Sequence, residues 1–257
     1  MHLVGRRARH GGHAHDATVA RKMRDVTEPV SYQLENKVAV IAMDDGKANA
    51  LSKAMIEGLI AALARAEQEA SAVVLTGRAE RFCAGFDLRV MMSSPAAATD
   101  LLRAGSDLLM NLYGATIPLV IACTGHALAG GALVVLTGDF RVGAAGAFKL
   151  GLNEVSIGLP VPVLAMELAR DRLLPTELPH ATLGAKIYNP EQAVAAGYLD
   201  VVVDPDQTLS RAKDEATRLG ALSRNAFRGT KTRLRGKTIE YIRAKMDDDM
   251  RTLLAPG

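Results

Sequence analysis

The chain has 257 residues, of which 49% are hydrophobic and 23% charged, and its formal net charge is +3. This length can bury one large core, or one core with a small appended unit. The first 25 residues carry six basic and two acidic side chains, and the remainder carries 25 basic and 26 acidic ones. The body of the chain therefore lacks the overall positive field that nucleic-acid-binding proteins use.

The sequence carries no signal for export or for insertion into a membrane. No apolar run reaches the ~18–20 residues that span a bilayer, and the N-terminus lacks the apolar segment of a signal peptide. Cys83 and Cys123 both lie in apolar runs, which is typical of buried free thiols in a reducing compartment. The sequence therefore predicts a cytoplasmic protein.

Residues 1–28 have the composition of a disordered or tag-like leader. Four of the six histidines lie there, and the run from His10 to His15 could hold a transition metal. A leader or an upstream start codon, with Met23 as the alternative start, is the simpler interpretation. We expect no metal site in the body of the chain.

Short apolar strands alternate with helices over the first half of the body. A hairpin is expected over Tyr32–Met43, turning at residues 35–37. Ser52 is placed to cap a helix whose apolar side chains recur at helical spacing. Continuously apolar strands are buried on both faces, which predicts an α/β fold. The other elements expected here are strands at 72–76, 118–123 and 140–142, and helices at 98–113 and from the Gly130-Gly131 turn to Thr137.

Helices dominate the sequence after residue 160. We expect them at 160–170, 175–185, 190–196, 207–221 and 224–248, with one strand at 199–203. This succession of helices suggests a small helical unit that packs on the core or on a neighbouring subunit. The predicted organisation is a leader (1–28), a core (29–197) and a C-terminal helical or oligomerisation region (198–257).

Two features in the middle of the chain indicate enolate chemistry. Glu154 stands at the start of a predicted helix within an apolar stretch, and apolar surroundings suit a carboxyl to proton transfer. Gly125–Ala132 is a glycine-rich turn that enters an apolar helix. Such a turn leaves backbone N–H groups free to stabilise an oxyanion.

A third segment, Phe82–Leu88, has the character of a sharp turn between a strand and a helix. Gly85 lets the backbone turn, and Asp87 can cap the helix that follows. Alone it is an ordinary turn, but together with the glycine-rich turn it could offer a second N–H to the same oxygen. No Gly-x-Gly-x-x-Gly stands between the first strand and helix, so a dinucleotide site is not predicted.

In these motifs the chain resembles the crotonase superfamily of enoyl-CoA hydratases and isomerases, over about Ser31 to Met250. The resemblance implies an α/β fold built as a spiral of ββα units with a helical C-terminal region. It also implies an acyl-CoA thioester as substrate, no cofactor beyond the coenzyme A of that substrate, and a homotrimer or homohexamer.

The resemblance further implies roles for single residues. The amides of Phe86 and Gly130 take the positions that hold the thioester oxygen. Lys231, on the last long helix, could meet a phosphate of coenzyme A, from its own or a neighbouring subunit; an exposed helix lysine without a function is the alternative. Residues at positions that line coenzyme A, many through their backbone, are Lys47, Ala48, Ala84, Asp87 and Leu88.

One position departs from the hydratase pattern. Hydratases of this family use two glutamates, and Leu133 stands where the first would be. Leucine cannot hold or activate water, but it can keep an acyl cavity dry. Gly151–Glu154 looks most like the mitochondrial-type 3-enoyl-CoA isomerases, which use a single glutamate. Pro162 occupies the place of the second carboxylate of dienoyl-CoA isomerases. The sequence therefore predicts conversion of 3-enoyl-CoA to 2-enoyl-CoA, with Glu154 as the base.

Two other functions stay open. One is a slow enoyl-CoA hydratase, forming 3-hydroxyacyl-CoA with Glu154 alone, and the other is a non-catalytic acyl-CoA-binding protein. Among further polar residues, His126 is interpreted as structural, and Asp139 and Glu167 as surface or capping charges. Asp107 lies on a helix that flanks the acyl pocket in the family.

Overall fold

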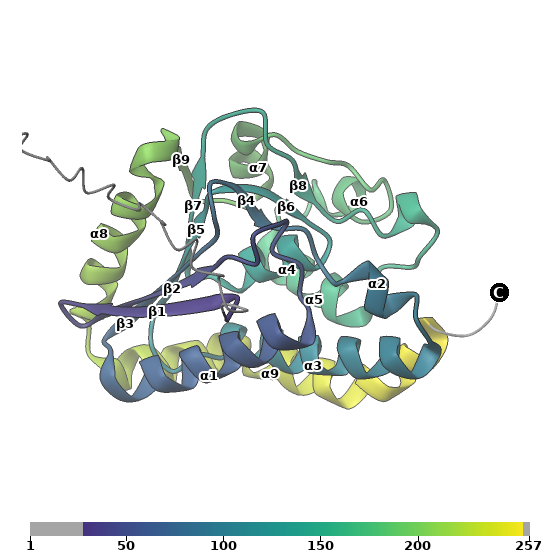
Figure 1. Cartoon of the computed structure of the whole chain (residues 1–257), viewed down its shortest axis with the longest axis horizontal. Helices are drawn as coiled ribbons and strands as arrows, with labels where there is room; N and C mark the ends of the chain where they lie inside the picture. Colours follow the sequence, from purple (N-terminus) through teal and green to yellow (C-terminus); the bar gives the residue numbers. More distant parts are fainter. Residues whose placement is uncertain (1–27, 254–257) are drawn as a thin grey trace, which may run out of the picture.

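The computed structural model describes residues 28–253, and a six-stranded sheet runs through its centre (Figure 1). The strand order is β1-β2-β3-β5-β7-β9, in which β1 is antiparallel to β2 and every other neighbouring pair is parallel. The strands are β1 (Val30–Glu35), β2 (Val38–Met43), β3 (Ala72–Thr76), β5 (Leu119–Cys123), β7 (Phe140–Ala144) and β9 (Val201–Val203). Residues 1–27 of the predicted leader, including its histidine run, lie outside the described residues.

The hairpin β1–β2 forms where the sequence predicts it. Asn36 and Lys37 connect the strands, and both have positive φ angles, 48° and 66°. Two such residues make the tight turn whose twist matches that of paired strands. The parallel strands β3 and β5 are buried along their whole length, which confirms that both faces of the sheet are covered.

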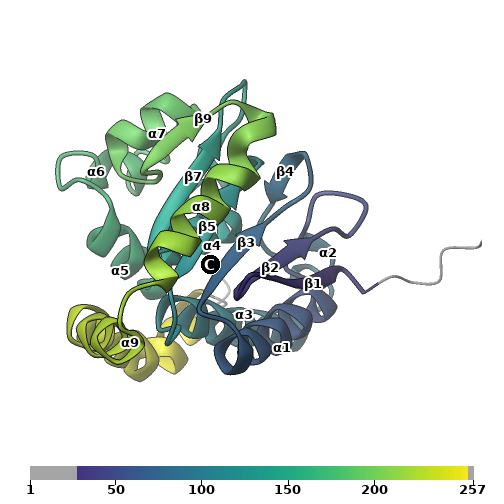
Figure 2. The ribbon, with the colours of Figure 1, turned by 90° about the vertical axis from the view of Figure 1, so that its left-hand side faces the viewer.

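Helices cover the two faces of the sheet unequally (Figure 2). On one side lie α1 (Lys53–Glu69), α3 (Pro95–Tyr113) and the long α9 (Arg224–Leu253). On the other side α8 (Thr208–Gly220) crosses the strands alone and buries Ala212 and Ala216 against them. Ser52 caps α1 as predicted, accepting the Met55 N–H at 3.3 Å.

A second, three-stranded parallel sheet has the order β4-β6-β8. Its strands are β4 (Glu80–Cys83), β6 (Gly125–Leu128) and β8 (Leu150–Gly151), which the sequence predicted only as turns and connections. After β4 comes the single-turn α2 (Leu88–Met91), and after β6 comes α4 (Gly130–Thr137), all of whose residues are buried. A short 3-10 turn, η1 (Val155–Ile157), follows β8.

The C-terminal part of the chain is not separate from the sheet. Between β7 and β9 lie α5 (Val163–Arg172), α6 (Leu178–Ala181) and α7 (Pro190–Ala196). Strand β9 then pairs with β7, and α8 packs on the central strands after η2 (Pro205–Gln207). The expected boundary at residue 198 therefore separates β9 and α8 from the sheet to which they belong. Of the C-terminal elements, α9 packs on other helices, α3 and α5, instead. Of the helix expected at 175–185, only the single turn α6 forms.

Within residues 28–253, no helix combines the length and the apolar character needed to cross a bilayer. Cys83 and Cys123 are buried free thiols, as predicted, and burial raises the pKa of each to about 12. Neither thiol is therefore poised to react as a thiolate.

Candidate active site

The small sheet β4-β6-β8 brings the predicted site residues to one edge. Phe86 follows β4, Gly130 follows β6 and Glu154 follows β8, each within a few residues of its strand. Because the three strands are parallel, their carboxyl ends lie at the same edge, where α/β proteins place their ligands. Adjacent strands are about 4.8 Å apart, so segments far apart in sequence become neighbours there.

The two glycine turns touch each other. A Cβ atom added at Gly85 would lie 3.2 Å from the Gly130 nitrogen, and one added at Gly130 would lie 3.1 Å from the Phe86 ring. Gly85 has a φ of +92°, which other residues rarely adopt. Leu51 braces the turn, because its N–H donates to Gly85 O at 2.8 Å and its carbonyl accepts the Asp87 N–H at 3.3 Å.

Two backbone donors remain unused on these adjoining turns. Among the described residues, neither the Phe86 N–H nor the Gly130 N–H donates to a protein acceptor. Gly130 is the first residue of α4, where an N–H has no partner within the helix and the helix dipole is positive. Such a pair of amides can stabilise a negatively charged oxygen.

Glu154 is buried at the entrance to η1, only 8% exposed. Its Oε2 atom has no hydrogen-bond partner among the described residues. Burial raises the pKa of Glu154, and the backbone N–H groups of Asn153 and Glu154 partly oppose that effect. Glu154 is thus buried, as expected for a carboxyl group in apolar surroundings. The predicted helix that follows it is only a 3-10 turn.

Tyr198 lies close to Glu154 and had no role in the sequence-based prediction. Its hydroxyl, like Glu154 Oε2 and Asn153 Oδ1, is buried without a described partner. Burial, followed by the charges of Tyr188 and Glu154, raises the pKa of Tyr198. Tyr198 comes just after α7 and carries no local motif, so only the tertiary fold shows that it borders the carboxyl.

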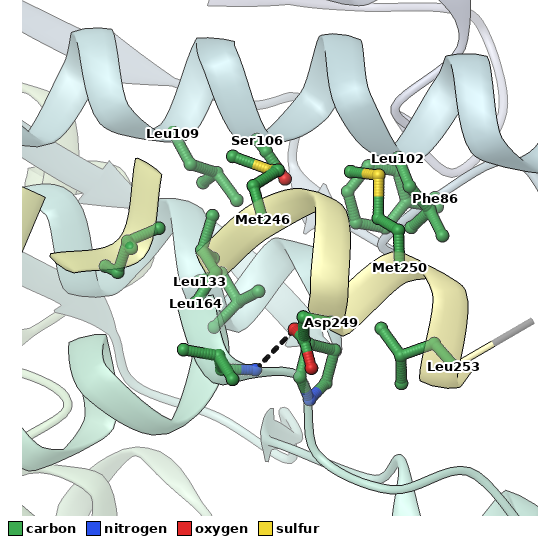
Figure 3. Close-up of a pocket in the computed structure, with 13 residues that line it drawn as sticks. Phe86, Leu102, Ser106, Leu109, Leu133, Leu164, Met246, Asp249, Met250 and Leu253 are labelled. Atoms are coloured by element: carbon green, nitrogen blue, oxygen red, sulfur yellow. Dashed lines mark hydrogen bonds between the residues drawn. The ribbon is translucent and has the colours of Figure 1, made fainter. Parts of the chain in front are cut away.

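A narrow cavity of about 40 Å³ opens between α3, α4, α5 and α9 (Figure 3). Leu133, which replaces the first hydratase glutamate, lines this cavity from α4 and is 3% exposed. Phe86 borders it from the side of the oxyanion turns. The remaining lining residues are Leu102, Ser106, Leu109, Pro162, Val163, Leu164, Ile242, Met246, Asp249, Met250 and Leu253.

Two residues expected to line coenzyme A share a second hollow, of about 260 Å³. Ala48 and Ala84 are joined there by a hydrogen bond from the Ala84 N–H to the Ala48 carbonyl, 3.1 Å long. Three basic side chains that the sequence-based prediction did not place there line the same hollow: Arg81, His126 and Lys149. Arg81 and Lys149 give the hollow positive charge, while burial lowers the pKa of His126 and favours its neutral form. The hollow therefore suits an anionic or polar ligand.

Of the other residues expected along coenzyme A, Lys47 and Leu88 are exposed and Asp87 is buried. Lys47 is exposed, and its carbonyl accepts a hydrogen bond from Arg78 at 2.9 Å. Asp87 caps α2 as predicted, and Arg89, 3.1 Å away, holds the pKa of that carboxyl below its usual range. Leu88 is 65% exposed.

Lys231 is not the exposed lysine that the sequence suggested as one alternative. It is 6% exposed, and its Nζ lies 2.7 Å from Asp139 Oδ2. Burial lowers the pKa of Lys231 to about 8. The interpretation of Asp139 as a surface charge is likewise wrong, because this carboxylate sits between Lys231 and Arg235, whose Nη2 is 3.0 Å away. The Lys231 ammonium is thus already paired within the chain.

Three further polar residues can be placed. His126 accepts the Lys149 N–H through Nδ1 at 3.0 Å and meets the Phe148 ring edge-on, so it helps to hold β6 beside β8. Asp107 is exposed on α3. Glu167 pairs with Arg170 at 3.1 Å. In residues 28–253, no group of three His, Cys, Asp or Glu residues could hold a metal ion.

Comparisons with known proteins agree with this fold. The model of the enoyl-CoA hydratase/isomerase family matches residues 33–253. Human mitochondrial enoyl-CoA delta isomerase 1 is 29% identical over 223 residues, which cover 85% of this chain and 74% of that protein. The chain thus belongs to the enoyl-CoA hydratase/isomerase family, within the crotonase superfamily.

Solved structures from mycobacteria carry both activity names. A Mycobacterium tuberculosis protein described as an enoyl-CoA isomerase is 41% identical with a TM-score of 0.82, covering 86% of this chain and 96% of that one. A second structure of the same protein is described as a probable enoyl-CoA hydratase. An enoyl-CoA hydratase from Mycobacterium ulcerans is 39% identical with a TM-score of 0.84, covering 88% and 100%. These similarities support an enoyl-CoA enzyme with a crotonase fold, and they leave the particular reaction to the chemistry of the site.

Proposed function

We propose that this protein converts 3-enoyl-CoA to 2-enoyl-CoA, with Glu154 as the only base. The supporting observation is one buried carboxyl at the sheet edge that carries two unused amides, with Leu133 in the adjoining cavity. The reaction removes a proton from C2 and returns one to C4. Because no water enters the product, a single carboxylate that serves both carbons suffices.

In this proposal the amides of Phe86 and Gly130 stabilise the thioester oxygen as it gains charge. Removing one donor of this kind typically raises the barrier by about 2.7–4 kcal/mol. Leu133 keeps the cavity dry, which strengthens both hydrogen bonds and the basicity of Glu154. A dry cavity also disfavours hydration, which needs a positioned water.

The coenzyme A part of the substrate would lie along Ala48, Ala84 and the surface formed by Lys47, Asp87 and Leu88. The shared hollow of Ala48 and Ala84 supports this assignment, as does the preference of the family for backbone contacts. A homotrimer or homohexamer remains part of the proposal through the family likeness. Its mass can be measured by light scattering.

The test uses a 3-enoyl-CoA substrate, with formation of the conjugated 2-enoyl product followed by absorbance. The variant Glu154→Gln should lose activity by about 10²–10⁴-fold, the usual contribution of a general base. The exposed Glu57 on α1 supplies the control, because Glu57→Gln removes the same charge away from the site. Equal turnover by wild type and Glu154→Gln would show that Glu154 is not the base.

The alternative is an enoyl-CoA hydratase that uses Glu154 alone, and the hydratase name of the Mycobacterium ulcerans structure favours testing it. Rapid loss of absorbance from a 2-enoyl-CoA, without isomerisation of the 3-enoyl compound, would establish that reaction instead. Binding of acyl-CoA by calorimetry with no turnover of either compound would leave the third candidate, a non-catalytic carrier.

A further inference from the structure

The acyl cavity contains a carboxyl group that the isomerisation does not use. Asp249 reaches the cavity from the last turns of α9, as Figure 3 shows. Among the residues that line the cavity, Ser106 and Asp249 are the ones with polar side chains, and all the others are apolar. A carboxylate on the wall of an apolar cavity loses hydration, which costs free energy unless hydrogen bonds or a cation replace the water.

Asp249 is held in place by a single hydrogen bond. Its Oδ2 accepts the N–H of Val163, the first residue of α5, at 2.7 Å. No basic side chain among residues 28–253 pairs with this carboxyl. Burial raises the pKa of Asp249, and the Val163 N–H partly opposes that effect. By contrast, its neighbours Asp247 and Asp248 are exposed and pair with arginines.

Capping of α5 explains only part of this arrangement. The residue just before α5 is Pro162, whose side chain offers no acceptor to cap the helix. Asp249 supplies that acceptor from another helix. An asparagine would supply that acceptor equally well without a charge. The second carboxyl oxygen remains, and a saturated chain filling the cavity would strip its water without replacing the lost hydrogen bonds.

We propose that Asp249 makes the enzyme select acyl-CoA substrates whose acyl chain carries a hydroxyl group beyond the reacting carbons. The hydroxyl donates to the free carboxylate oxygen while the other oxygen stays on Val163. This inference rests on the proposed function in one respect, that the acyl chain occupies this cavity. The cavity of about 40 Å³ holds only a few water-sized groups, since one water needs about 10–15 Å³ by the same measure.

Three matched substrates test the selection: 3-hexenoyl-CoA, its 5-hydroxy derivative and its 6-hydroxy derivative. In wild type the better hydroxylated compound should have a kcat/KM roughly 10- to 100-fold higher, as for a hydrogen bond to a charged group. Asp249→Leu should reverse that preference, because the alkyl chain then meets an apolar wall. Asp249→Asn keeps an acceptor for Val163 and should show a reduced preference.

Asp248→Leu is the control, because Asp248 is the exposed neighbour that pairs with Arg251, and it should leave the substrate preference unchanged. A purely structural role for Asp249 predicts a different pattern, in which all substrates slow by one factor and their ratio stays at the wild-type value. That pattern, or a wild type that prefers the unsubstituted chain, would overturn the proposal.

Binding of unreactive compounds separates this inference from the proposed reaction. Hexanoyl-CoA and 6-hydroxyhexanoyl-CoA lack the double bond, so calorimetry measures their affinities whether or not the protein isomerises anything. Tighter binding of the hydroxylated compound to wild type, lost in Asp249→Leu, supports the selection even if no 3-enoyl-CoA is converted. Equal affinities in both proteins would refute it even if isomerisation is fast.

Discussion

At the scale of one residue, burial of Glu154 has two effects: it raises the pKa of the carboxyl group, and it makes the ionised form less stable in the folded protein. The carboxyl is buried, one of its oxygens has no described partner, and nearby Tyr198 offers a hydroxyl that is likewise unpartnered. A carboxylate in such a place is poorly solvated and therefore more basic than in water. The same condition makes the ionised folded state less favourable.

Replacing Glu154 by Gln should accordingly raise the melting temperature at neutral pH. The folded pKa is raised, so between the ordinary glutamate pKa and the raised one the folded state binds more protons than the unfolded chain. The free energy of unfolding therefore falls as pH rises through that interval and stays lower above it. Calorimetry at pH 4 and pH 7 should show a gain for Glu154→Gln at pH 7 only, and an equal difference at both would contradict this account.

The pH dependence of the reaction follows from the same group. The base must be ionised, so kcat/KM should rise with pH through the raised pKa of Glu154 and then level off. The midpoint should lie above the ordinary glutamate value of about 4.3. Initial rates between pH 4 and pH 8 measure this limb, and a midpoint at or below the ordinary value would show that Glu154 is not the titrating base.

At the scale of elements, the close packing of α4 on the small sheet fixes the geometry of the two turns. A Cβ atom added at Gly131 would lie 2.0 Å from the Cys83 carbonyl oxygen, which is backbone and cannot swing away. The helix therefore begins directly against the end of β4. This contact keeps the Gly130 amide beside the turn that carries Phe86.

Gly131→Ala should consequently cost more than the ~1–3 kcal/mol of ordinary overpacking, and activity should fall because the two turns separate. Gly236→Ala is the control, since it lies within α9 with nothing nearer than 3.9 Å to the added atom. That control should gain about 0.5–1 kcal/mol from helix propensity. Urea unfolding of both variants measures the difference, and a stable, active Gly131→Ala would show that the contact is not needed.

At the scale of the whole molecule, one buried charge cluster ties α9 to the body. Asp139, just before β7, pairs with Lys231 and Arg235 of α9 and accepts the Leu119 N–H at 2.8 Å. Arg235 also donates to the carbonyl of Tyr113 at 2.9 Å. Since the far end of α9 forms a wall of the cavity that Leu133 lines, this cluster anchors a helix that shapes that cavity.

Asp139→Ala should destabilise the protein by about 3–5 kcal/mol, because it leaves two buried cations uncompensated. Lys231→Met should cost less, since Arg235 still neutralises Asp139. Denaturant unfolding of the two variants gives the comparison directly. A larger loss for Lys231→Met than for Asp139→Ala would mean that Lys231 contributes mainly through packing.

The sequence by itself determined the hairpin, the capped α1, the apolar strands of the main sheet and the three motifs that carry the family likeness. These features depend on interactions between residues close together in the sequence, such as those of the Asn36-Lys37 turn and the Ser52 cap. They can therefore be predicted from the sequence.

Only the tertiary structure decided the small sheet, the burial of Lys231 and the position of Asp249 on the wall of the cavity that Leu133 lines. Strands of two to four residues are too short to show a period, and their pairing joins distant segments. Lys231 looks exposed in the sequence because most of its neighbours on α9 are polar, and Asp249 looks like its exposed neighbours Asp247 and Asp248. Their environments depend on which face of α9 meets the core, and that choice is made by packing across the whole molecule.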